Sequence, residues 1–243
     1  MRDFAPVRAG IFGWQAKAAV EALGPREIES IDLASIEALV LGVDPSMGGS
    51  VSLVAHPVHK GPDPYERVLG IWRWHTTQVG GQKGTFVDGG MYSSILARKE
   101  VYAYLAKLLL AIARRDIDAG AKGGKRLPYV PLLIRIEGQH INPKALNSII
   151  PTASSSGLWI SMVGASPTAA YAIEQPSAWR SYYGIKGQRE RVKAEALARV
   201  RMLYRIPGNI GLTDDDAEAV LLAGIPQGTV LVNPNVKKRK RKK

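Results

Sequence analysis

Carboxylates stand at the ends of two apolar segments and at the start of a third segment near the C-terminus. Asp44 ends an apolar run at residues 38–44, and Glu137 ends a second run at residues 129–137. Near the C-terminus the acids are Asp214, Asp215, Asp216 and Glu218. A charged group at the rim of an apolar core is costly unless it meets a partner or a cation. These acids are therefore the candidates for chemistry.

The acids converge if the two apolar runs are neighbouring strands and the last segment is a helix across their ends. Two divalent cations held about 3.5–4 Å apart by such carboxylates can activate water for phosphodiester cleavage. We expect Mg²⁺ in this all-oxygen site, with Mn²⁺ as a possible substitute. Each acid alone has a structural interpretation, as a turn residue, an ion-pair partner or a first-turn helix residue.

Two pairs of acids lie on one face of the predicted last helix. Asp214 is four residues before Glu218 and Asp215 is three residues before it, so either acid can share a face with Glu218. Two like charges this close repel unless a cation lies between them. The spacing predicts a metal-binding face and leaves both choices open.

The hydrophobic pattern predicts an α/β domain that begins with three strands, at residues 38–44, 50–55 and 67–74. A helix at residues 92–117 and a strand at 129–137 are predicted next, followed by a helix at 157–165 and a strand at 169–173. Two helices, at residues 186–204 and 213–223, complete the domain. Thr213 is a suitable N-cap for the last helix. Strands and helices therefore alternate after the opening strands.

Three segments are distinguished along the chain. Residues 1–36 form an N-terminal extension in which 7–23 is predicted as a short helix ended by Gly24 and Pro25. Residues 37–228 form the predicted α/β domain, which carries all the candidate acids, and residues 229–243 form a basic tail. The predicted organisation is thus one domain with two extensions.

The chain is basic, with 33 Lys and Arg against 21 Asp and Glu and a net charge of +12. The tail from Lys237 to Lys243 carries seven of these charges, which leaves 12 − 7 = +5 on the remainder. Such a surface favours polyanions as partners, because each neutralised phosphate releases counterions. We interpret the tail as a DNA tether, a nuclear-type sorting signal or a solubilising segment.

Several other chemistries are excluded or disfavoured. The chain has no cysteine, which excludes disulfides and thiolate chemistry. The four histidines do not follow a recognised zinc-ligand spacing; they are His56, His59, His75 and His140. No apolar run reaches the roughly 20 residues that a membrane span requires, so we expect a soluble protein.

The acidic motifs resemble those of the RuvC-like Holliday junction resolvases, which belong to the RNase H-like superfamily. Leu41-Gly-Val-Asp-Pro45 is similar to the family's first motif, and Ile134-Arg-Ile-Glu137 is similar to the second. The segment from Asp214 to Ala223 is similar to the third. The resemblance implies an RNase H-like fold with a five-stranded mixed sheet, three antiparallel opening strands and flanking helices.

The sequence is most similar to the plastid, monokaryotic-chloroplast type of this family, through Gly157-Leu-Trp-Ile160 and Pro176-Ser-Ala-Trp-Arg180. The spacing in bacterial members selects Asp215 with Glu218. In the plastid type a His stands four residues before the Glu, which selects Asp214. The resemblance implies a plastid location, with the bacterial or phage cytoplasm, the mitochondrion and the nucleus as alternatives.

The resemblance also implies an activity: a homodimer that binds a four-way DNA junction and nicks two strands symmetrically. The residues it suggests for DNA contacts are Trp179, Arg180, Lys186, Arg189 and Arg191, with Lys193 as the lysine on the catalytic face. Trp179 and the pair of Tyr182 and Tyr183 could stack on unpaired bases, with ordinary core packing as the alternative for at least one of them.

Two other functions remain open at this point. One is an RNase H-like nuclease for RNA or RNA–DNA hybrids, and the other is a noncatalytic basic nucleic-acid-binding protein.

Overall fold

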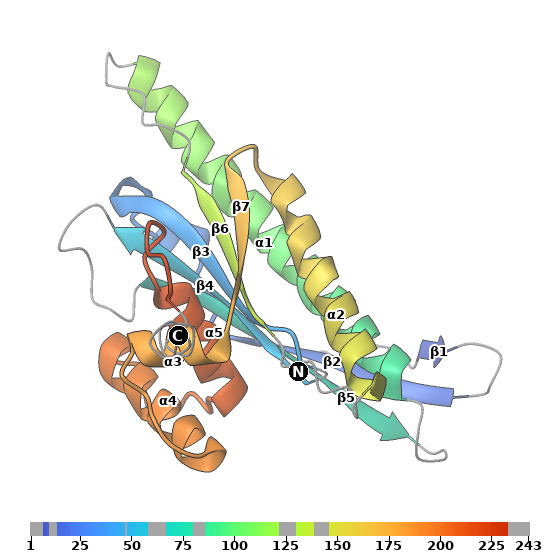
Figure 1. The fold of residues 1–243 in the computed structure, drawn as a ribbon. Helices are drawn as coiled ribbons and strands as arrows, with labels where there is room; N and C mark the ends of the chain where they lie inside the picture. The colour runs from blue at the N-terminus through green and yellow to red at the C-terminus, as the bar shows by residue number, and fades with distance from the viewer. Residues whose placement is uncertain are drawn as a thin grey trace, which may run out of the picture.

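The computed structural model describes residues 7–9, 14–46, 48–57, 67–79, 86–121, 130–138 and 146–232 (Figure 1). The basic residues from Lys237 to Lys243, together with His59 and His140, lie outside the described residues. In the described part, no helix combines the length and the apolar composition that are needed to cross a bilayer.

A mixed sheet forms the centre of the molecule, and its described strands follow the order β1-β2-β5-β4-β3-β6-β7. Adjacent strands β3, β4 and β5 are antiparallel, whereas β6 runs parallel to β3 and β7 runs parallel to β6. This arrangement confirms the predicted α/β, RNase H-like fold. The strands are β1 (Val7–Ala9), β2 (Trp14–Leu23), β3 (Ile36–Asp44), β4 (Ser50–Pro57), β5 (Val68–Val79), β6 (Leu132–Glu137) and β7 (Ala169–Glu174).

The N-terminal segment differs from its prediction, because residues 7–23 do not form a helix. Strand β2 pairs antiparallel with β5 from Gln15↔Val79 to Leu23↔Ile71, so the described sheet has seven strands instead of five. Alanine favours helices, but Lys17 and Glu21 alternate with apolar residues at the period of a strand. The unpaired edge of the long strand β5 offers backbone hydrogen bonds that outweigh the helix propensity. The domain boundaries at residues 36 and 228 remain predictions.

Helices cover both faces of the sheet (Figure 1). On one face lie α1 (Phe86–Ala121) and α2 (Leu146–Ile160), followed by the 3₁₀ turn η5 (Ser161–Ala165). On the other face lie α3 (Pro176–Tyr182), α4 (Arg189–Tyr204) and α5 (Asp214–Gly224). Two further 3₁₀ turns, η1 (Ile28–Ser30) and η2 (Leu33–Ser35), precede β3.

Strand β3 is buried on both of its faces. Leu39, Leu41 and Val43 join the apolar core under α1 and α2, whereas Val40 joins the core under α3, α4 and α5. Period-two alternation places successive side chains on opposite faces of the sheet. The nearly continuous apolar sequence of this strand is therefore explained by its central position.

Gly42 of β3 lies directly beneath α5. A Cβ at this position would stand 2.0 Å from the backbone oxygen of Ala219 and 2.4 Å from the backbone nitrogen of Ala223. At the start of α5, Thr213 and Asp216 form a reciprocal capping box. The absence of a side chain at Gly42 thus allows the closest approach of helix and strand.

We predict that Gly42→Ala lowers the free energy of unfolding by about 1–3 kcal/mol, the usual cost of overpacking a filled core. The added methyl group would collide with the α5 backbone, which cannot rotate away as a side chain can. Gly157→Ala in α2 is the matched control, because its Cβ would meet nothing within 4 Å. Chemical denaturation of both variants measures the difference, and equal stabilities would contradict the prediction.

Candidate metal centre

Three buried carboxylates meet at one end of the sheet. Asp44 ends β3, Glu137 ends the parallel neighbour β6, and Glu218 lies in the second turn of α5. One oxygen of each carboxylate lies within 4.8 Å of the others. Three acids that are far apart in the sequence are therefore brought together, as the sequence predicted.

Helix α3 supports this carboxylate triad through two consecutive residues. The indole Nε1 of Trp179 donates a hydrogen bond of 2.9 Å to Glu137 Oε1. The Nη2 of Arg180 lies 3.7 Å from Glu137 Oε1 and 3.5 Å from Glu218 Oε1. Arg180 is thus a cation shared by two acids of the triad.

The structure disagrees with the prediction that the Trp179 ring stacks on DNA bases. Its side chain is 0% exposed and belongs to the core beneath α3, α4 and α5. A ring without solvent access cannot stack on nucleobases, so this prediction is wrong for the conformation described. The indole instead orients Glu137.

The three consecutive aspartates of α5 point to different partners. Asp214 forms an ion pair with Lys193 of α4, and Asp216 forms one with Arg73 of β5. Asp215 lies close enough to Asp44 for its charge to raise the pKa of Asp44. Of the two alternatives left open by the sequence, Asp215 is therefore the one beside the triad.

Burial and crowding of like charges raise the pKa of the acids around the triad. Burial raises the pKa of Asp44 well above its ordinary value, and the charges of Glu137, Asp215 and Glu218 raise it further. Burial, followed by the charge of Glu137, raises the pKa of Glu218 to about 8. Burial and Asp214 also raise the pKa of Asp215. Protons therefore occupy part of this site near neutral pH.

The pKa of Asp214, in contrast, is lowered. Although partial burial disfavours its charged form, the hydrogen bond from Lys193 lowers the pKa of Asp214. The same bond raises the pKa of Lys193. This pair therefore stays ionised at the edge of the site.

A second network fixes the start of α5, and it was not anticipated from the sequence. Asp216 is fully buried, accepts a hydrogen bond of 2.8 Å from Ser50 Oγ and pairs with Arg73. The Arg73 guanidinium also donates to the backbone oxygen of Gly211 at 2.7 Å and lies 3.3 Å from Glu21. The only sequence signal was a charged residue between Trp72 and Trp74 in an apolar strand.

The other predicted DNA contacts lie near α3 and α4. Lys186, Arg189 and Arg191 are exposed, as a phosphate contact requires. Tyr182 is 47% exposed, whereas Tyr183 is half-buried and donates a hydrogen bond of 2.8 Å to the backbone oxygen of Leu221. Of the two tyrosines, Tyr182 is the more accessible to a ligand.

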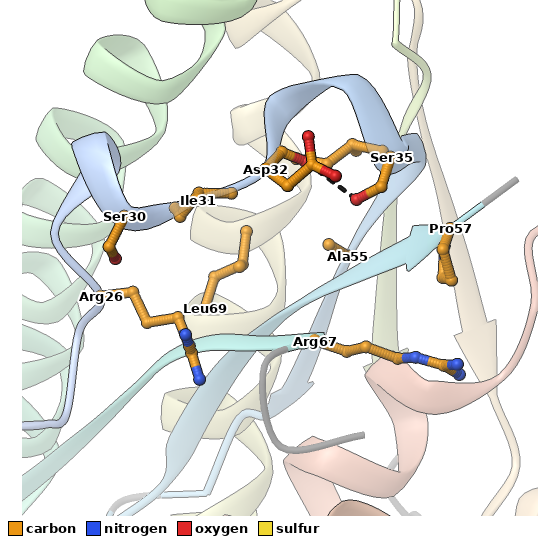
Figure 2. A pocket seen from close by; sticks show the side chains of 10 residues that line it. Arg26, Ser30, Ile31, Asp32, Ser35, Ala55, Pro57, Arg67 and Leu69 are labelled. Atoms are coloured by element: carbon orange, nitrogen blue, oxygen red, sulfur yellow. Dashed lines mark hydrogen bonds between the residues drawn. The ribbon is translucent and has the colours of Figure 1, made fainter. Parts of the chain in front are cut away.

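A separate hollow lies at the other end of the strands (Figure 2). It is bordered by Ile36, the first residue of β3, whereas Asp44 is the last. Eight residues of strand correspond to about 26 Å. This hollow is therefore distinct from the carboxylate site.

The carboxylate site fits a divalent cation. Its donors are carboxylate oxygens, which Mg²⁺ prefers, and they are gathered from three elements around one point. Burial raises the pKa of Asp44 and of Glu218, and the charge of Glu137 raises both further, so repulsion between the carboxylates persists in the folded protein. A bound cation would relieve this repulsion.

Comparisons with known proteins found similar solved structures. No family model matches the sequence, and no curated protein is significantly similar to it. Two structures of Thermus thermophilus RuvC are similar at a TM-score of 0.40, one at 12% identity and the other, in complex with a Holliday junction substrate, at 10% identity. Both matches cover 76% of this chain and 90% of the RuvC chain. The strand order and the strand directions of this chain define its fold.

We predict that Mg²⁺ stabilises the protein more at about pH 8.5 than at about pH 5.5. Because the pKa of Glu218 rises from 4.5 to about 8 on folding, the folded protein binds more protons between these values. Without metal, this residue's contribution to the unfolding free energy therefore falls as pH rises through that window. Mg²⁺ requires ionised carboxylates, so its stabilising effect grows instead. Thermal unfolding with and without Mg²⁺ tests this, with Glu218→Gln as control, and an equal Mg²⁺ effect at both pH values would contradict it.

We also predict that Arg180→Met tightens Mg²⁺ binding at about pH 8.5 by roughly tenfold, because it removes a cation that competes for Glu137 and Glu218. Methionine retains much of the apolar stem. Arg189→Met is the matched control, since Arg189 is exposed at the start of α4. Calorimetric titration with Mg²⁺ measures the affinity, and weaker binding by Arg180→Met would show that the arginine supports the metal site.

Proposed function

We propose that this protein is a magnesium-dependent endodeoxyribonuclease that resolves four-way DNA junctions by paired symmetric nicks. The observation that carries the proposal is the buried triad of Asp44, Glu137 and Glu218 at the ends of two parallel strands and a helix. Three buried carboxylates that converge on one point offer the oxygen ligands that a divalent cation prefers.

The residues that would hold metal are Asp44, Glu137 and Glu218, with Asp215 at the side of Asp44. Asp214 is not favoured as a ligand, because it pairs with Lys193. Two Mg²⁺ ions held by such acids supply an activated water and stabilise the leaving oxygen of a phosphodiester.

The protein's own residues have distinct roles in this proposal. Trp179 orients Glu137, and the pair of Arg73 and Asp216 holds the first turn of α5 in place. Both are positioning roles, since these side chains act through a carboxylate or a helix. Lys193 lies at the edge of the site, where its ion pair with Asp214 leaves its charge near an approaching phosphate.

Exposed cations beside the site would bind the DNA backbone. Lys186 precedes α4, and Arg189 and Arg191 lie in its first turn. Phosphate contacts of this kind position a duplex without reading its sequence. We therefore propose that selectivity comes from the shape of the junction.

Paired nicks require two active sites, and we propose that a homodimer provides them. A four-way junction has two-fold symmetry, and an isologous dimer has the same symmetry. The resemblance of the acidic motifs to those of junction resolvases supports this choice of substrate over a linear duplex.

We predict that Asp44→Asn and Glu137→Gln each reduce junction cleavage more than about 100-fold, beyond the usual loss for a residue that only supports a metal ligand. Both substitutions keep the side-chain shape, and the exposed phosphate-binding residues are unchanged, so junction binding should persist. Cleavage and gel-shift assays with a mobile four-way junction measure the two properties separately.

The controls for this experiment are a variant and two further substrates. Glu29→Gln changes an exposed acid of η1, far from the triad, and should cleave normally. Linear duplex and RNA–DNA hybrid should be cut more slowly than the junction. Faster cleavage of the hybrid would overturn the choice of substrate, and unchanged cleavage by Asp44→Asn would overturn the proposed active site.

A further inference from the structure

Helix α1 has an exposed apolar stripe in addition to its buried face. Its inner side contributes core residues such as Val101, Leu105 and Leu108. Its outer side exposes four large apolar residues, which are Ile95 at 38%, Tyr102 at 47%, Leu110 at 52% and Ile117 at 64%. Scattered apolar residues on a surface need no explanation, but an aligned row indicates a contact surface.

The spacing of this stripe is symmetric about Ala106, which is also exposed. Tyr102 and Leu110 each stand four residues from Ala106, and Ile95 and Ile117 each stand eleven residues from it. Four residues are about one helical turn and eleven are about three, so all five lie on one side of the helix. The stripe extends about 33 Å along the helix.

A sequence with this symmetry is complementary to a second copy of itself in the antiparallel direction. A two-fold axis through Ala106 would place Tyr102 against Leu110 of the second copy and Ile95 against Ile117 of that copy. The small residue on the axis allows the two helices to approach closely, within the usual 8–10 Å or so. An isologous interface requires this self-complementarity.

The charges that flank the stripe are also complementary in the antiparallel arrangement. Glu100 would lie opposite Arg114 of the second copy on one flank. On the other flank Arg98 would lie opposite Asp116, which already pairs with the neighbouring Arg115. Each pair is offset by two residues from the symmetric position, which is about 3 Å along the helix and within side-chain reach. A parallel pair would also set opposite charges together, with Glu100 against Arg98 and Arg114 against Asp116. The antiparallel direction is therefore selected by the symmetric spacing of the apolar residues about Ala106, and the charges are compatible with it.

The stripe is accessible in the fold. Figure 1 shows α1 on the outside of the sheet, beside α2, with its C-terminal end extending past the strands. The helices that carry Glu218 and Lys193 lie on the opposite face.

We propose that the protein self-associates through antiparallel packing of α1 against α1 of a second copy, with Ala106 on the two-fold axis. The inference deepens the proposed function, because it assigns a surface to the homodimer that paired nicking requires. The contact itself needs neither metal nor DNA. Its test is therefore independent of the nuclease assay, and failure of one is distinguishable from failure of the other.

Cysteine cross-linking tests both the contact and its register, and the chain offers a background without cysteine. Ala106→Cys should form a disulfide-linked dimer, because the two Cβ atoms meet on the axis. Ala113→Cys alone should not, since the two copies of residue 113 lie on the order of 21 Å apart. A mixture of Lys99→Cys and Ala113→Cys should cross-link, because these positions are symmetric about Ala106.

Ala106→Arg tests the energetic contribution of the axis. Two arginines on the axis would repel, so the dissociation constant measured by sedimentation should rise at least about tenfold. Ala194→Arg, at an exposed position of α4, is the matched control and should leave association unchanged.

Three outcomes would overturn the proposal. Cross-linking of Ala113→Cys with itself would indicate a parallel or different register. A dimer unaffected by Ala106→Arg would place the interface elsewhere. A protein that is monomeric at about 100 µM and forms no disulfide with any variant would leave the stripe to a partner other than a second copy.

Discussion

The arrangement of the carboxylate site is governed by the electrostatic repulsion among the three acids of the triad and by the contacts that offset this repulsion. Asp44, Glu137 and Glu218 are buried with oxygens within 4.8 Å of one another, a placement that disfavours three simultaneous charges. The described residues offset it with the Trp179 hydrogen bond, the shared Arg180 and partial protonation. Repulsion between buried carboxylates destabilises the folded protein. A cation bound between them would remove this repulsion, so the site is suited to a divalent cation.

The position of α5 determines whether the triad can form. Gly42 lets the helix backbone rest on β3, and the ion pair of Arg73 with buried Asp216 holds the first turn against β4 and β5. Both contacts lie next to the triad: Gly42 is two residues before Asp44, and Asp216 is two residues before Glu218. The residues that position α5 and the acids of the triad therefore lie in the same short sequence motifs. A change in either motif would affect the packing of α5 and also the carboxylate site.

The sequence was sufficient to predict the sheet centre and the three acids, because a buried strand that ends on a carboxylate is recognisable locally. It was insufficient wherever a distant element decides the outcome. The strand β2 depends on the free edge of β5, which outweighs the helix propensity of its alanines. Trp179 was assigned to DNA because its motif does not reveal that α3 turns the indole toward Glu137. The choice between Asp214 and Asp215 depended on Lys193, which lies on another helix.

The sheet separates the two surfaces that the proposed function needs. The exposed cations of α4 lie on the same side as α5, whereas the stripe of α1 lies on the opposite side. Pairing through α1 would therefore leave the carboxylate sites of both copies uncovered. The two sites, each at the end of its own sheet, would then be related by the axis through Ala106. A four-way junction has the same two-fold symmetry as such a dimer, so its two equivalent strands can meet two equivalent sites. The proposed dimer contact and the carboxylate site therefore use separate elements of the fold, α1 for the contact and β3, β6 and α5 for the site.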